Sequence, residues 1–95
     1  MVGIGDVTTW DTGCTPREQA EKMMEEVMEV FAIIDQNGLN PATKCDVLRE
    51  CADVVQATCN LVAMVSGEVR AVHGAGYFEQ EMAACLERQR ERGRL

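Results

Sequence analysis

Two pairs of acidic side chains lie in segments whose other residues favour helices. The first pair is Glu26 and Glu29, and the second is Glu50 and Asp53. Residues three positions apart project from one face of a helix, so each pair presents two carboxylates side by side. The second pair also interrupts a largely apolar stretch, where an unpaired carboxylate is costly. Bound cations would offset this cost, and carboxylate oxygens suit hard ions such as Mg²⁺ or Mn²⁺.

Two helices joined by a short turn are predicted to carry these pairs. The segment Thr15–Glu18 combines a capping threonine, a first-turn proline and the glutamate of a capping box. The helix that starts there should run to Gln36 or Asn37, where Gly38 ends it. Asn40-Pro41 repeats the start chemistry for a second helix. Because the turn is short, we expect the helices to be antiparallel, with the two acidic pairs facing each other at similar heights.

Two further polar residues share faces with the acidic pairs. Lys22 lies on the same side of the first helix as Glu26 and Glu29, where it can neutralise a phosphate beside bound cations. Asn60 is a polar amide among apolar residues on the side of the second helix that carries Glu50 and Asp53. We expect Asn60 to hydrogen-bond a sugar or a base at the end of the site.

The whole chain is predicted to be one all-α domain, since no strand-like alternation appears in it. The second helix should reach at least Ser66, with Gly67 as its end or a weak point, and a last helix should run from about Tyr77 to Arg92. The predicted parts are a leader over 1–14, the hairpin over 15–66, a connector over 67–76 in which 68–72 can be helical, and the C-terminal helix with its basic tail over 77–95. Trp10 is the one large anchor of the leader.

The apolar patterns of both helices indicate self-association. Met24, Val27, Phe31 and Ile34 recur at helical spacing and are predicted to form one buried stripe. The second helix is apolar on most sides, and one partner helix cannot cover it. We therefore expect a homodimer or homotetramer built as a four-helix-type bundle.

Composition excludes several classes of protein. The net charge of −7 disfavours nucleic-acid binding. A phosphorylated ligand should arrive with divalent cations, or the site should hold them. Five cysteines without CxxC spacing and a single histidine argue against a zinc site and fit a reducing cytoplasm. Neither a signal peptide nor a membrane-spanning segment is expected.

The basic residues gather near the end of the chain, where four arginines lie: Arg88, Arg90, Arg92 and Arg94. They suit either a solvated helix end or a mobile tail that touches a phosphate or a subunit.

The two acidic pairs together resemble a known signature. Glu25-Glu26-x-x-Glu29, twenty intervening residues and Glu50-x-x-Asp53 are similar to the EExxE…ExxD motif of the MazG-like all-α nucleoside triphosphate pyrophosphohydrolases. Lys22 and Asn60 also fit the family pattern, and the similarity covers about residues 18–65. The related phosphoribosyl-ATP pyrophosphohydrolases often have Tyr-His after the motif aspartate, where this chain has Val55-Gln56-Ala57, so that branch fits less well.

The resemblance implies Mg²⁺-dependent cleavage of a nucleoside triphosphate between its α and β phosphates. The four motif carboxylates, Glu26, Glu29, Glu50 and Asp53, would then hold the ions, which activate a water and polarise the phosphates. Lys22 would stabilise phosphate charge. Glu25 would hold or deprotonate the water, although it suits an exposed helix position equally well. Trp10 would stack on the base if the leader folds back, but core packing suits it better.

Two other interpretations fit the same residues. The chain can be a non-enzymatic helical dimerisation or adaptor protein, whose carboxylates are solvated surface charge. A diiron four-helix site is the weaker option, because it usually needs a Glu-x-x-His pair and neither motif has a histidine there. Pyrophosphate release separates the enzyme from the adaptor.

Overall fold

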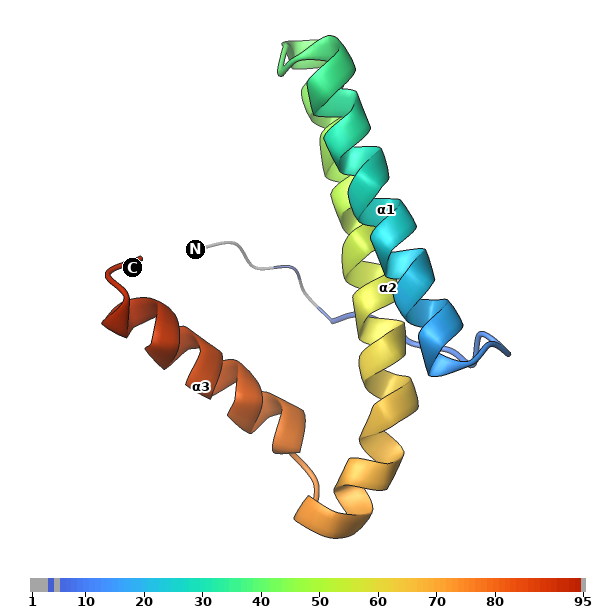
Figure 1. The fold of residues 1–95 in the computed structure, drawn as a ribbon, viewed down its shortest axis with the longest axis vertical. Coiled ribbons are helices and arrows are strands. Elements are labelled where there is room, and N and C mark those ends of the chain that lie inside the picture. Colours follow the sequence, from blue (N-terminus) through green and yellow to red (C-terminus); the bar gives the residue numbers. More distant parts are fainter. Residues whose placement is uncertain (1–3, 5, 95) are drawn as a thin grey trace. The chain divides into compact units, whose positions relative to one another are not determined.

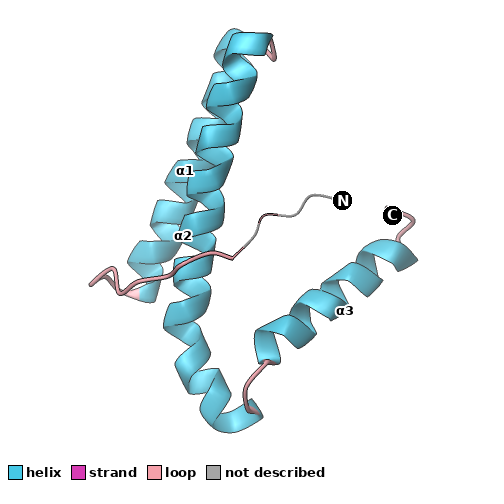
Figure 2. Cartoon of the chain, turned by 180° about the vertical axis from the view of Figure 1, so that it is seen from behind, coloured by secondary structure: helices cyan, strands magenta, loops and turns pink. Residues whose placement is uncertain are grey.

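The computed structural model describes residue 4 and residues 6–94, and its regular structure is helical throughout (Figures 1 and 2). The helices are α1 (Pro16–Asn37), α2 (Pro41–His73) and α3 (Tyr77–Glu91). No strand occurs in the described residues, so the all-α prediction is confirmed. The parts of the predicted leader and tail at 1–3, 5 and 95 lie outside the described residues. Within the described range, none of the helices is long and apolar enough to span a membrane.

Helix α1 begins and ends where its local chemistry predicts. The Thr15 hydroxyl accepts a hydrogen bond from the Glu18 amide at 3.1 Å, and the Thr15 amide donates to Glu18 Oε1 at 3.0 Å. This capping box satisfies two backbone groups that a helix start leaves unpaired. At the other end, Gly38 adopts a φ of 68° and its amide donates to the Ile34 carbonyl at 2.9 Å. A side chain is strained at that φ, so glycine suits the stop.

Helix α2 starts as predicted but continues well past Gly67. Asn40 Oδ1 accepts hydrogen bonds from the amides of Ala42 and Thr43, both at 3.0 Å, and so caps the helix. Of the two alternatives predicted for Gly67, the end of the helix is wrong, because α2 runs through it. A single glycine weakens a helix by only about 1 kcal/mol relative to alanine, which the flanking residues can overcome. The helix ends at His73, where Gly74 turns to a φ of 83° and its amide donates to the Arg70 carbonyl.

The chain divides into two compact units, residues 1–64 and 65–95. The first holds the leader, α1 and most of α2, and its two helices lie side by side and antiparallel (Figures 1 and 2). The leader crosses α2 and is hydrogen-bonded to it. The second unit holds the end of α2, the turn at 74–76 and α3, whose predicted extent is close to the observed one.

The contact between α1 and α2 has the spacing of a coiled-coil seam. The seam positions, which we define as the inward-facing residues that recur four and three apart, are Gln19, Met23, Glu26, Val30 and Ile33 on α1 and Thr43, Val47, Glu50, Val54, Ala57, Leu61 and Met64 on α2. All of them are buried or half-buried. Two glutamates therefore occupy the middle of a contact that is otherwise largely apolar.

The predicted buried stripe of α1 lies outside this seam. Met24 is 68% exposed and Phe31 is 58% exposed, and Val27 and Ile34 are exposed as well. The stripe prediction is wrong for the single chain because α2 packs on the face that carries Glu26, which lies one residue round the helix from Val27. Ala57, at 5% exposure, is the one buried apolar residue in the described part of the chain. The hairpin alone therefore leaves much apolar surface uncovered.

Candidate functional site

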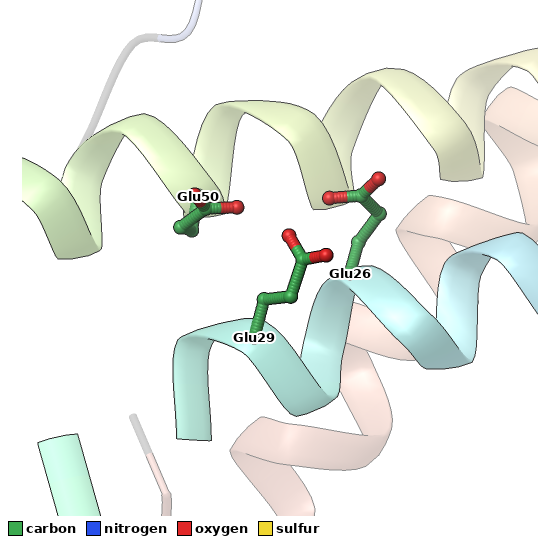
Figure 3. Close-up of side chains that lie close together, drawn as sticks. All are labelled: Glu26, Glu29 and Glu50. Carbon is green, nitrogen blue, oxygen red and sulfur yellow. The ribbon is translucent and has the colours of Figure 1, made fainter. Parts of the chain in front are cut away.

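Three carboxylates meet at the middle of the seam. Glu26 and Glu29 project from α1 toward Glu50 on α2 (Figure 3), and an oxygen of each lies within 4.8 Å of an oxygen of the others. We call these three residues the carboxylate cluster. It joins one residue of the second predicted pair to both residues of the first. Hard oxygen donors at this separation can surround a divalent cation such as Mg²⁺ or Mn²⁺.

Two oxygens of the cluster are shielded from solvent and unpaired. Glu26 Oε2 and Glu50 Oε2 are the buried side-chain oxygens or nitrogens that lack a hydrogen-bond partner in the described residues. Their neighbours in the cluster are other carboxylates, which cannot donate a hydrogen bond when ionised. An ordered water, a shared proton or a cation can satisfy them.

The same crowding raises the pKa values of both residues. Partial burial is the main cause that raises the pKa of Glu26, followed by the negative charges of Glu29 and Asp53. A hydrogen bond with Glu29, which needs a shared proton, is the main cause that raises the pKa of Glu50, followed by partial burial. Both carboxyls thus hold protons more tightly than free glutamates do, as expected where like charges lack a counterion.

Asp53 lies beside the cluster but outside it. Its charge contributes to the raised pKa values of Glu26 and Glu50, so the three groups are close. Asp53 also lines a pocket of about 440 Å³ that adjoins the cluster through Glu26. Lys22 lines this pocket too, and its positive charge opposes the rise in the Glu26 pKa. The pocket is of a size typical of small-molecule sites, about 300–1,000 Å³.

The far part of the pocket is polar. Asn60 is 3% exposed and Gln19 is 1% exposed, and both line it. Gln19 Nε2 donates to the Ala57 carbonyl at 3.0 Å, which connects α1 to α2 at the pocket. Gln56 Nε2 donates to Asn60 Oδ1 at 3.2 Å. The structure therefore brings Asn60 into the same pocket as Lys22, Glu26 and Asp53.

The leader forms one wall of this pocket. Trp10 lines it together with Asp11 and Thr12, and its side chain is 56% exposed. The expectation that Trp10 packs in the core is wrong, because the leader crosses the hairpin at its surface. An exposed indole at the rim of a polar pocket can instead stack on a flat ligand.

Glu25 is exposed and outside the carboxylate cluster. It is one residue before Glu26 and so points about 100° away from it around the helix. The structure thus assembles all the candidate site residues around the cluster and the pocket except Glu25.

Sequence reasoning missed two residues of the site, Gln19 and Gln56. Gln19 lies seven positions before Glu26 and therefore occupies the same seam, a signal that heptad counting can find. Gln56 lies between Asp53 and Asn60 on one side of α2. Its partner in the leader is 48 residues away in the sequence, and no local pattern reveals such a contact.

Comparisons of this chain with protein-family models, with curated proteins and with solved structures gave no match.

Proposed function

We propose that this protein is a Mg²⁺-dependent nucleoside triphosphate pyrophosphohydrolase. Its substrate would be a ribo- or deoxyribonucleoside triphosphate, cleaved by water between the α and β phosphates to give a monophosphate and pyrophosphate. The carboxylate cluster and Asp53 would hold one or more Mg²⁺ ions, for which Mn²⁺ can substitute.

One observation carries the proposal: Glu26 belongs both to the carboxylate cluster and to the wall of the adjoining pocket. A cation held by the cluster would therefore lie at the mouth of a pocket that can accept a small molecule. Mg²⁺ keeps several of its ligand positions for water and substrate phosphates, so a site with few protein ligands suits it. The similarity of the acidic spacing to the MazG-like signature supports the same reaction class.

Different residues around the pocket would contact different parts of the substrate. Bound Mg²⁺ would polarise the phosphoryl oxygens and lower the pKa of the attacking water. Lys22, which lines the pocket, would balance negative charge on the phosphates as the bond between the α phosphorus and the bridging oxygen breaks. Asn60 and Trp10, at the other part of the pocket, would hold the nucleoside. The role of Glu25 in holding or deprotonating the water stays a prediction, and Glu25→Gln tests it through kcat.

The adaptor interpretation accounts less well for the cluster. Solvated surface carboxylates are exposed and hydrogen-bonded to water, whereas Glu26 and Glu50 are half-buried and each has a shielded, unpaired oxygen. Keeping such groups in a seam weakens the helix contact unless a ligand binds there. A role limited to dimerisation gives no reason for that cost.

We further propose that the hairpin associates with copies of itself into a four-helix-type bundle. The stripe on α1 and Leu48 on α2 are apolar and exposed in the single chain. A chain of 95 residues with so little buried apolar surface needs additional burial to be stable.

The test is release of pyrophosphate from a panel of the eight canonical ribo- and deoxyribonucleoside triphosphates. We expect turnover of at least one of them with Mg²⁺, a monophosphate as the second product, and loss of turnover in EDTA that added Mg²⁺ restores. Release of inorganic phosphate in place of pyrophosphate would contradict the proposed bond cleavage. Absence of any turnover would favour the adaptor.

A further inference from the structure

Gln56 connects the leader, which is distant in the sequence, to the buried Asn60 on its own helix. Its side chain lies on α2, where it lines the pocket beside Asp53. Its Nε2 donates to the Thr8 carbonyl of the leader at 2.8 Å and to Asn60 Oδ1 at 3.2 Å. One amide nitrogen thus holds both the leader and the buried asparagine.

These two contacts determine how both amides are oriented. The Thr8 carbonyl can only accept a hydrogen bond, so the nitrogen of Gln56 must face it. The same nitrogen faces Asn60, so Asn60 turns its oxygen toward Gln56. Asn60 is 3% exposed and lines the pocket. Because its oxygen is turned toward Gln56, its NH₂ group is the end that can donate to a ligand in the pocket.

The leader is fastened on both sides of Trp10. Gln56 holds it at Thr8, before the tryptophan. After the tryptophan, the Thr12 hydroxyl and the Cys14 thiol are 2.9 Å apart, and that thiol donates to Gln19 Oε1 at 3.4 Å. Trp10 therefore lies in a short segment, residues 8–14, that is hydrogen-bonded to the hairpin at both ends. These contacts determine where Trp10 lies at the pocket.

We propose that Gln56 is the positioning residue for the nucleoside end of the site. It turns the Asn60 NH₂ toward the ligand, and it keeps Trp10 at the pocket wall. The pocket then selects nucleosides that present a hydrogen-bond acceptor to Asn60 and a flat base face to Trp10. This inference rests on the proposed function, because it assigns the nucleoside of that substrate to this end of the pocket.

Trp10 is the single tryptophan of the chain, so its fluorescence reports directly how firmly residues 8–14 are held against the hairpin. Gln56→Met keeps the length of the side chain and removes both hydrogen bonds. We expect it to increase quenching of Trp10 by acrylamide relative to the wild type. Gln36→Met, the same change at an exposed site on α1, should leave the quenching unchanged. If Gln56→Met unfolds the protein by circular dichroism, Gln56→Asn retains the amide but is too short to reach both partners, and the same result is expected.

Binding of the four deoxynucleoside monophosphates, followed by Trp10 quenching without metal, tests recognition separately from turnover. We expect saturable binding of at least one, and Gln56→Met should weaken it about tenfold, as for one lost hydrogen bond. Affinity for Mn²⁺ should stay at the wild-type value, which general damage to the fold would not allow. Gln56-dependent nucleotide binding without pyrophosphate release would support this inference and overturn the hydrolase. Wild-type turnover with unchanged binding in both Gln56 variants, or no binding of any monophosphate, would overturn the inference.

Discussion

Glu26 and Glu50 stand at seam positions that helical pairs usually fill with apolar residues. Each carboxyl group replaces an apolar contact, and the two groups also repel each other and Glu29. Their raised pKa values are the electrostatic sign of that conflict. A bound divalent cation would remove the conflict by supplying positive charge to all three at once. At the scale of the residue, the proposed ion binding and helix packing would therefore make opposing demands on the same side chains.

Glu50→Gln should separate these demands in an activity assay. Glutamine has nearly the same shape but lacks the charge that attracts a hard cation. Loss of residues that merely orient metal ligands costs about 10–100-fold, so loss of a direct ligand should reduce kcat/KM by at least about 100-fold. Glu68→Gln makes the same change at an exposed site on α2 and should retain wild-type turnover. Wild-type activity in Glu50→Gln would remove Glu50 from the proposed ligands.

The pH dependence of stability without metal follows from the same pKa values. A carboxyl group whose pKa is raised in the folded state binds more protons there than in the unfolded chain. Its stabilising contribution is complete below the unfolded pKa, near 4.5, and is lost as pH rises through the higher folded pKa. In EDTA, the melting temperature should therefore fall as pH rises from about 4.5 toward neutrality.

The variant Glu50→Gln tests whether the Glu50 carboxyl group causes this fall in melting temperature. In EDTA at pH 7, Glu50→Gln should melt above the wild type, and its fall in melting temperature over the same pH range should be smaller. Added Mn²⁺ should raise the melting temperature of the wild type and have little effect on the variant. A variant that melts below the wild type in EDTA would show that the Glu50 carboxylate is stabilising without a metal.

How much of the site could be predicted depends on how far apart in the sequence the contacting residues are. The cluster of Glu26, Glu29 and Glu50 follows from two local rules, spacing on a helix face and a short turn. Asp53 stayed outside the cluster because its position falls off the seam, between Glu50 and Ala57, and its side chain is one methylene shorter than glutamate. The pairing of Gln56 with the leader depends on where a loop crosses the helix, which no periodic pattern contains.

At the scale of the element, ends with local capping chemistry were predictable. Both ends of α1 and the start of α2 depend on residues within a few positions of the helix, and the structure has them where the sequence indicates. Gly67 was misread because a weak helix former inside a long helix is outweighed by its neighbours. The inward face of α1 was misread because its most hydrophobic stripe is not the one that contacts α2.

Thr15→Ala tests the capping box that starts α1. It removes the hydroxyl that accepts from the Glu18 amide, and an N-cap replacement of this kind costs about 0.5–2 kcal/mol. Denaturant unfolding should show that loss, with an unchanged dependence on denaturant concentration.

The same cap also depends on pH, because the hydrogen bonds from Thr15 lower the pKa of Glu18. The cap therefore stabilises the protein fully above the ordinary glutamate pKa and weakens as pH falls through the lowered value.

Thr15→Ser serves as the control, because serine retains the accepting oxygen. It should stay within a few tenths of a kcal/mol of the wild type. Equal losses in Thr15→Ala and Thr15→Ser would show that the threonine methyl group, and not the cap, accounts for the effect.

At the scale of the whole molecule, the distribution of apolar surface is the main argument for association. The hairpin leaves Met24, Met28 and Phe31 exposed along one side of α1, although these are among its largest apolar side chains. A second copy can cover this stripe with the same stripe, since a two-fold interface repeats one surface on both partners. The seam with α2 and the stripe would then be the two contact faces of α1 in a bundle.

Phe31→Glu tests that arrangement. If the stripe is the interface, each copy loses roughly 2 kcal/mol of apolar burial, and a symmetric dimer about 4 kcal/mol, or about a thousandfold in Kd. Light scattering after size exclusion should show an oligomer for the wild type and a monomer for the variant at the same micromolar concentration. Gln36→Glu adds an equal charge to α1 away from the stripe and should keep the wild-type mass. A wild-type monomer, or a variant with unchanged mass, would show that something other than a second copy covers this face.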